Sequence, residues 1–382
     1  MKKYVILLLL PFLIHCNNPG KKINIPTIDV YPDNNLTIKN GLSYSHFVVL
    51  TSPDEYLIGD IYKIQLINDH IYILDQTKSS VFIFDKNGSF IYRFNKKGRS
   101  SNEYLIIQDF EIDQQGNIHI LDDLNDKFFV YDQKGNFLNA TPARSAAAFK
   151  LLNNGLIAYN IGNGSSVPGE ENLHNYICTK ENNVIIKDIP FNKGLVGRRL
   201  NLGVGKSSFY LCQNEIYTTF PLNDTIYQVD KNIGILTPFL AFDLKTVRPM
   251  PTDSPQKAID YFNDIIKSDI PSSPFGFNKH NDKIRIQFIN QHRFHTIRAN
   301  INGTFIENGI AEYDDFGLPY SPMSYYDSDN TGFILSVIHS HNLEIFTQLA
   351  TKKNKDLSVI TEINSALINN ENPILVFYTI PE

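Results

Sequence analysis

The sequence lacks most of the features that would place it directly in a biochemical class. Its 40 acidic and 35 basic residues nearly balance, so it has neither the basic surplus of a nucleic-acid-binding protein nor a polybasic patch for a membrane surface. It contains no Gly-x-Ser-x-Gly motif, the turn that carries the nucleophile of many serine hydrolases. Gly205-Lys206-Ser207 resembles the end of a phosphate-binding loop, but that motif requires glycine where this chain has Leu200. We therefore expect no nucleic-acid partner.

The N-terminus lacks an apolar run long enough to span a membrane. Residues 4–14 form an apolar run of eleven residues after two lysines, which suits the core of a secretory signal. Leu13-Ile-His-Cys16 then resembles a bacterial lipobox, in which the cysteine is acylated and becomes the mature N-terminus, although His15 stands where a small residue is usual. We expect a lipoprotein signal peptide over residues 1–15 and lipid attachment at Cys16. An ordinary signal peptide followed by an unrelated cysteine is the alternative.

The segment after the cysteine lacks hydrophobic periodicity. Asn17-Asn-Pro-Gly-Lys-Lys is polar, and we expect residues 16–40 to comprise the lipidated cysteine and a flexible tether. No acidic run, of the kind that accompanies surface display in some envelope lipoproteins, follows Cys16. The sequence therefore predicts a protein held in the cell envelope by a lipid anchor. The oligomeric state stays open, with a monomer favoured. The outer membrane is favoured, and the choice between its periplasmic and surface faces stays open.

A repeat organises residues 58–141. Ile71-Tyr-Ile-Leu-Asp75, Phe82-Ile-Phe-Asp85 and Gly88 have counterparts 47 positions later, as the pairs 75 and 122, 85 and 132, and 88 and 135 show. The apolar residues alternate or form short blocks rich in Ile, Val, Phe and Tyr, which is typical of strands. Asp85-Lys-Asn-Gly88 lies between two blocks and predicts a β-hairpin, because glycine tolerates positive φ. Each unit is a meander of about four strands, the size of one propeller blade.

Such four-stranded units cannot bury both faces alone, so copies must stack around an axis. Strand-like segments recur later in the chain, at residues 156–159, 176–179, 209–212, 216–219, 226–230, 283–289, 294–299, 304–306 and 332–338. Residues 372–379 form a further strand that needs a partner, and we expect it to pair with residues 47–50 and close the ring. The predicted fold is all-β, a six-bladed β-propeller of four-stranded antiparallel blades over residues 41–382.

One segment interrupts the strand pattern. Residues 254–268 carry apolar side chains at helical spacing after a Ser-Pro start, which predicts a short amphipathic helix inserted between blades. We expect this helix to cover one face of the propeller; a lid that contacts a ligand is the alternative.

One motif resembles that of a known family. Gly98-Arg-Ser-Ser-Asn-Glu-Tyr104 resembles a segment of the six-bladed β-propeller lipoproteins of Bacteroidota, relatives of NHL-repeat propellers. The family commonly has Gly-Arg-Gly-Pro-Gly-Glu-Tyr there, and this chain has Ser-Ser-Asn in the middle. The closing Asn372-Pro-Ile-Leu-Val also resembles the family's last strand, so the resemblance covers nearly the whole mature chain. It implies the fold and an envelope location, but no activity is assigned to the family.

Two loops supply candidate ligand-binding residues. Arg99 and Glu103 lie in an inter-blade loop, where propellers present polar side chains. Arg198 and Arg199 lie in a glycine-rich loop and could bind an anionic or sugar ligand. The competing interpretation is that Glu103 and Tyr104 fasten neighbouring blades and that the arginines are surface charges. We favour it for Glu103 and Tyr104 and leave the two arginines open.

The signals for metal and disulfide chemistry are weak. His339 and His341 would share one face of a strand and could chelate a metal, but no third ligand is evident. Residues 327–332 resemble the first half of a calcium loop that lacks its closing glutamate. Cys178 and Cys212 lie in expected strands of different blades, so two buried thiols are favoured over a disulfide. We expect no catalytic residues, no metal and no cofactor.

Two functional hypotheses follow. The first is a non-enzymatic, lipid-anchored propeller that binds a peptide, a glycan or an envelope protein. The second is a metal-dependent propeller enzyme of the lyase or lactonase type, which would need several acids or histidines converging on the channel. We favour binding, since the sequence shows no such constellation.

Overall fold

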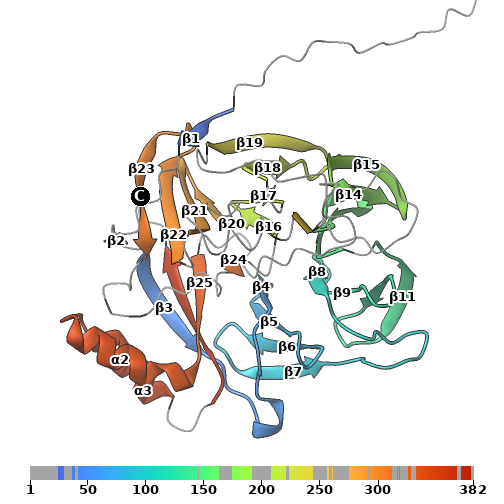
Figure 1. The fold of residues 1–382 in the computed structure, drawn as a ribbon. Coiled ribbons are helices and arrows are strands. Elements are labelled where there is room, and N and C mark those ends of the chain that lie inside the picture. Colours follow the sequence, from blue (N-terminus) through green and yellow to red (C-terminus); the bar gives the residue numbers. More distant parts are fainter. Residues whose placement is uncertain are drawn as a thin grey trace, which may run out of the picture.

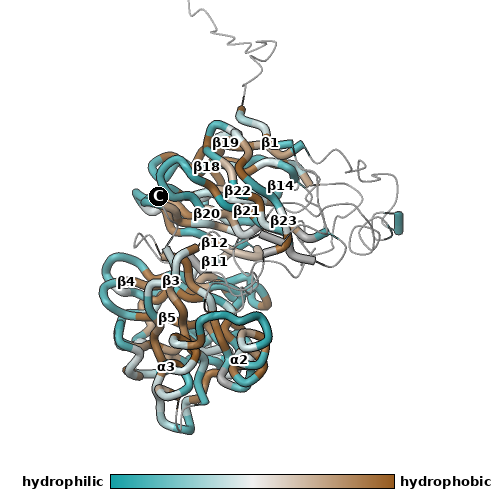
Figure 2. Tube along the Cα trace, turned by 90° about the vertical axis from the view of Figure 1, so that its left-hand side faces the viewer, coloured by the Kyte–Doolittle hydropathy of each residue, from teal (hydrophilic) through white to brown (hydrophobic). Residues whose placement is uncertain are grey.

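Six β-sheets surround a central axis in the computed structural model (Figure 1). The structure describes residues 25–29, 37–38, 42–144, 146–162, 174–191, 208–220, 223–243, 256–257, 260, 275–290, 293–311, 316, 318, 326–327, 333–367 and 371–379. The predicted six-bladed β-propeller is confirmed. Apolar residues concentrate in the strands, and many of the connecting turns are hydrophilic (Figure 2).

The first three blades follow one another along the chain. Blade 1 is β4 (Lys63–Ile67), β5 (His70–Asp75), β6 (Ser80–Asp85) and β7 (Phe90–Phe94); blade 2 is β8 (Asp109–Ile112), β9 (Ile118–Asp122), β10 (Lys127–Tyr131) and β11 (Phe137–Pro142); blade 3 is β12 (Ala148–Leu151), β13 (Leu156–Asn160), β14 (His174–Lys180) and β15 (Asn183–Pro190). Neighbouring strands within each blade are antiparallel. The first strand of each blade is innermost, since β8 contacts both β4 and β12.

The other three blades include N-terminal strands. Blade 4 is β16 (Phe209–Cys212), β17 (Glu215–Thr218), β18 (Thr225–Val229) and β19 (Leu236–Asp243), with β1 (Thr27–Asp29) outside β19; blade 5 is β20 (Phe275–His280), β21 (Lys283–Asn290), β22 (Arg293–Asn300) and β23 (Phe305–Ala311), with β2 (Thr37–Ile38) outside β23; blade 6 is β24 (Tyr326–Asp327), β25 (Phe333–Ile338), β26 (Ile374–Thr379) and β3 (Ser43–Val49). Both β1 and β2 pair in parallel. These two stretches of the expected tether are therefore strands.

The ring closes as the sequence predicts. Strand β3 pairs with β26, with Phe47 opposite Val376 and Val49 opposite Ile374. Asn372, which precedes β26, accepts a hydrogen bond from the Ile58 backbone N–H at 2.9 Å. The two ends of the propeller are thus joined by a sheet and by a side-chain anchor.

The repeated aspartates hold equivalent loops. Asp75 accepts the backbone N–H of Gly59 at 2.8 Å, and Asp122 accepts that of Leu105 at 2.7 Å. Each carboxylate also accepts N–H bonds from the turn that follows it. The 47-residue spacing therefore places one acceptor in each of blades 1 and 2, and this acceptor ties the incoming loop to the turn between the second and third strands.

Hydrophobic clusters join most neighbouring blades. They lie between blades 1 and 2, 2 and 3, 3 and 4, 4 and 5, and 6 and 1. Cys178 and Cys212 are buried free thiols in two different clusters, as the favoured sequence interpretation expects. Burial raises the pKa of the Cys178 thiol to about 11, so this thiol is protonated at neutral pH.

Two helices at the edge of blade 6 were not expected from the sequence. Helices α2 (Leu343–Lys352) and α3 (Ser358–Ala366) pack their apolar faces on β25 and β26. The helix expected over residues 254–268 falls largely outside the described residues, of which 256–257 and 260 are helical. No helix within the described ranges is long and apolar enough to cross a membrane.

Candidate functional site: a pocket between the first and sixth blades

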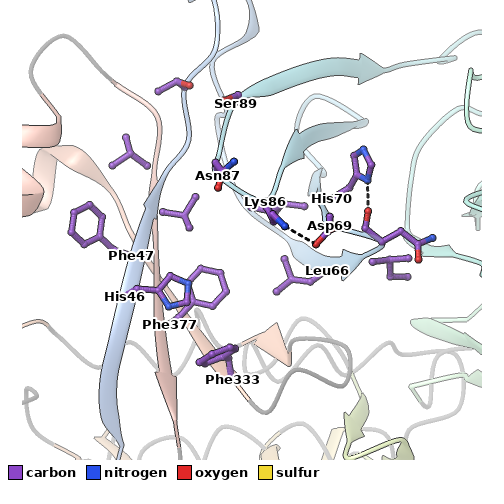
Figure 3. A pocket seen from close by; sticks show the side chains of 16 residues that line it. His46, Phe47, Leu66, Asp69, His70, Lys86, Asn87, Ser89, Phe333 and Phe377 are labelled. Atoms are coloured by element: carbon purple, nitrogen blue, oxygen red, sulfur yellow. Dashed lines mark hydrogen bonds and ion pairs between the residues drawn. The ribbon is translucent and has the colours of Figure 1, made fainter.

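A pocket of about 930 Å³ opens between blades 6 and 1 (Figure 3). One wall consists of β3 together with Phe333 of β25 and Phe377 of β26. The other wall consists of two turns of blade 1, the β4–β5 turn and the β6–β7 turn. Its volume lies within the range of small-ligand pockets. The walls come from both ends of the propeller, so the pocket exists only because the ring closes here.

Aromatic rings form the floor of the pocket. The imidazole of His46 stacks on Phe377, with ring centroids 4.4 Å apart and planes 10° apart. Phe333 meets both rings edge to face, at 5.4 Å from His46 and 5.9 Å from Phe377. Desolvation lowers the pKa of His46, so its ring is neutral at pH 7. The stacked His46 and Phe377 rings offer an uncharged face on which an apolar or planar group can stack, and Phe333 stands edge-on beside them.

Polar groups form the opposite rim. Lys86 and Asp69 form an ion pair at 3.3 Å across the two turns of blade 1, with side chains 64% and 76% exposed. Exposed pairs of this kind contribute little to stability, so both groups are available to a ligand. The Nδ1 of His70 donates a hydrogen bond to the carbonyl oxygen of Asn68 at 2.7 Å.

The β6–β7 turn makes a close approach to β3. Gly88 has φ +89°, and a Cβ atom at this position would lie 2.2 Å from the carbonyl oxygen of Val49. The Thr51 backbone donates its N–H to the Gly88 carbonyl at 2.8 Å and accepts the Phe90 N–H at 3.0 Å. Glycine at position 88 therefore serves both the turn and the contact between the blades.

The loop singled out by the family resemblance lies at the other end of the blade 1 strands. Tyr104 is fully buried and donates a hydrogen bond to the Ser79 carbonyl of blade 1 at 2.9 Å, so it fastens blade 1 to the loop that leads into blade 2. Glu103 accepts the Ser100 backbone N–H at 2.9 Å, and this bond lowers the pKa of Glu103. Arg99 is exposed in the same loop. Glu103 thus stabilises its own turn, and ligand binding by Arg99 and Glu103 stays a prediction.

The remaining candidates are not brought together into a site. Arg198 and Arg199 lie outside the described residues, as does most of the calcium-like segment 327–332. His339 and His341 follow the strand that ends at Ile338, so the alternation of a strand does not place them on one face. Their rings lie 5.5 Å apart around a 3₁₀ turn, and metal binding by this pair stays a weak prediction. The described part of the chain holds no group of three His, Cys, Asp or Glu side chains placed to bind a metal ion.

A buried charge network joins the innermost strands of blades 1, 2 and 3. Lys63 on β4 bonds Asp109 at 2.9 Å and Glu111 at 2.8 Å on β8, and Glu111 bonds Lys150 on β12 at 2.9 Å. Burial alone would lower the pKa of Lys63, but the two carboxylates raise it above its ordinary value. Burial raises the pKa of Asp109, whereas the two lysines hold that of Glu111 below its usual range. The network thus links the inner strands of three blades through buried, mutually compensated charges.

Comparison with known proteins identifies the family. The family model described as a domain of unknown function, DUF4934, matches residues 25–379. The chain belongs to the DUF4934 family. Comparison with curated proteins gives no match.

Solved structures of the same fold come from Bacteroides. An exported protein from Bacteroides fragilis NCTC 9343 superposes with a TM-score of 0.73 at 16% identity, covering 94% of this chain and 100% of its own. A DUF4221 family member from Bacteroides vulgatus has a TM-score of 0.54 at 10% identity, covering 88% and 97%. A streptogramin B lyase has a TM-score of 0.42 at 15% identity, covering 77% and 80%, which is too low to support an argument. The two Bacteroides structures support the fold of this DUF4934 chain.

Proposed function

We propose that this DUF4934 protein is a lipid-anchored binding module of the cell envelope that captures its ligand, without chemistry, in the pocket between blades 6 and 1. The observation that carries the proposal is the pocket itself, with its neutral aromatic floor and its exposed Lys86–Asp69 rim. Concave, mostly apolar pockets with a few polar groups are typical of ligand sites. The signal sequence with its candidate lipidation site at Cys16 supports the envelope location and the anchor.

The enzymatic alternative has less support. A metal-dependent lyase or lactonase would need acids or histidines that converge on one point. The described residues contribute no such group of three, and the carboxylates buried near the axis, Asp109 and Glu111, are engaged by Lys63 and Lys150. No second function is proposed.

The test is a binding measurement with variants in the pocket and in the loop between blades 1 and 2. The purified protein is screened against a peptide library and a glycan array, and the tightest ligand is titrated by calorimetry. His46→Ala should weaken binding about tenfold, the loss of one good stacking contact. Lys134→Ala should leave binding unchanged. Lys134 lies on the exposed β10–β11 turn of blade 2, which corresponds to the Lys86 turn of blade 1 but is not part of the pocket. Binding lost in Arg99→Ala but retained in His46→Ala would move the site to the inter-blade loop and refute the proposal.

A further inference from the structure

The wall of the pocket formed by β3 is the edge of a sheet. In blade 6 the strand order is β24-β25-β26-β3, so β3 is the outermost strand. Its inner edge pairs with β26, and no strand among the described residues pairs with its outer edge. Four consecutive β3 residues, 46–49, line the pocket. Side chains alternate between the two faces of a strand, so four neighbours in a row can border one space only if the strand presents its edge to it.

The hydrogen bonds of Thr51 show which backbone groups face the pocket side. Its N–H and its C=O both bond blade 1, at Gly88 and Phe90. In an extended strand the backbone groups of alternate residues point to the same side, so Val49 and Phe47 turn their N–H and C=O groups the same way. The Val49 carbonyl lies against Gly88, which agrees with this alternation. The Val49 N–H and both backbone groups of Phe47 therefore border the pocket.

The molecule already accepts added strands on such edges. Strand β1 pairs in parallel with the outermost strand of blade 4, Thr27 opposite Ala241. Strand β2 does the same on blade 5, Thr37 opposite Ile310. Extended segments thus occupy the outer edges of the two blades that precede β3 around the rim.

We propose that the pocket takes an extended peptide segment of another protein, which adds to the outer edge of β3 as a fifth strand of blade 6. This deepens the proposed function and rests on it. The peptide backbone bonds Phe47 and Val49, and one of its large apolar or aromatic side chains stacks on His46, Phe333 and Phe377. Main-chain bonds supply affinity and the side-chain pocket supplies selectivity, as in other strand-addition complexes. A glycan would use the aromatic floor but has no need for the regular backbone donors of β3.

The test separates backbone recognition from side-chain recognition. The probe is a nine-residue peptide selected on the purified protein from an unbiased display library, titrated by calorimetry. Val49→Pro removes one edge N–H and should weaken binding about tenfold, whereas Val49→Ala, which keeps that N–H, should change it less than about twofold. His46→Ala should also weaken binding about tenfold. Thermal unfolding of each variant checks that the fold is retained.

Amide exchange provides a second measurement. Bound peptide should slow hydrogen exchange at the Phe47 and Val49 amides and leave that of Val48 unchanged, because Val48 faces β26. If Val49→Pro binds as well as Val49→Ala while His46→Ala fails, the pocket binds a ligand but not by strand addition. If only glycans bind, and His46→Ala weakens glycan binding, strand addition is wrong and the proposed function is supported. If His46→Ala changes the affinity for no ligand, both strand addition and the proposed function are wrong.

Discussion

The two junctions of blade 1 differ in how they are closed. Its junction with blade 2 lies within the repeat and is packed by Tyr104, Tyr131 and their neighbours over the Lys63 charge network. Its junction with blade 6 is assembled from the two ends of the propeller and opens into the pocket. Both have apolar cores. The junction within the repeat is therefore closely packed, whereas the junction made by ring closure leaves room for a site.

The largest expected effect is at the closed junction. Lys63→Met leaves Asp109 and Glu111 buried without this cation, and we expect the free energy of unfolding to fall by about 3–5 kcal/mol. Urea denaturation followed by circular dichroism measures it. The loss of unfolding free energy should be greater at pH 8 than at pH 5. At the lower pH the two carboxylates take up protons more readily, and this removes buried negative charge that Lys63 no longer balances.

The matched control for this variant lies at the pocket. Lys86→Met removes an ion pair of the same residue types that is exposed, and the loss should stay below about 0.5 kcal/mol. Equal losses in the two variants would contradict the contrast between a buried network at one junction and an exposed rim at the other.

An intermediate effect is expected from glycines that the repeat makes equivalent. Gly88 and Gly135 both have positive φ, at +89° and +77°. Gly135→Ala should cost about 1–2 kcal/mol, the strain of alanine in that conformation. Gly88→Ala adds a clash with the Val49 backbone and should cost about 2–4 kcal/mol. Thermal and urea unfolding of the two variants provide the comparison, and equal costs would show that the Gly88 contact does not hold β3 against blade 1.

The sequence predicts the repeated part of the fold well and the pocket poorly. The 47-residue repeat is visible in the sequence and predicts blades 1 and 2. Residues 372–379 form a strand-like segment at the end of the chain with no neighbouring strand to pair with, and this predicts the ring closure. The helices α2 and α3 carry apolar residues at helical spacing, such as Val359, Ile360 and Ile363, and this signal could have found them. The pocket offers no such signal, because its lining comes from five separate segments.

The charge network shows a limit of strand alternation. Lys63 and Gln65 alternate with Ile64 and Leu66, a pattern that normally places the polar residues in solvent. In a propeller the neighbouring blades cover both faces of a sheet, so Lys63 and Gln65 are buried and find partners on β8. Alternation identifies the strand correctly but assigns its polar face wrongly.

The smallest expected effect is the titration of His46 at the open junction. Its pKa is lowered by desolvation, so the folded state favours the neutral ring. Its contribution to stability is present above the ordinary histidine pKa of about 6.5 and is lost as pH falls through the lower folded value. Titration of the ring protons by NMR should give a pKa below 6.5, and a peptide side chain over the ring should lower it further. Phe377→Leu removes the stacked ring and should bring the pKa back towards its ordinary value. A pKa above the ordinary value would contradict an apolar floor and favour a ligand that recognises a cationic imidazole.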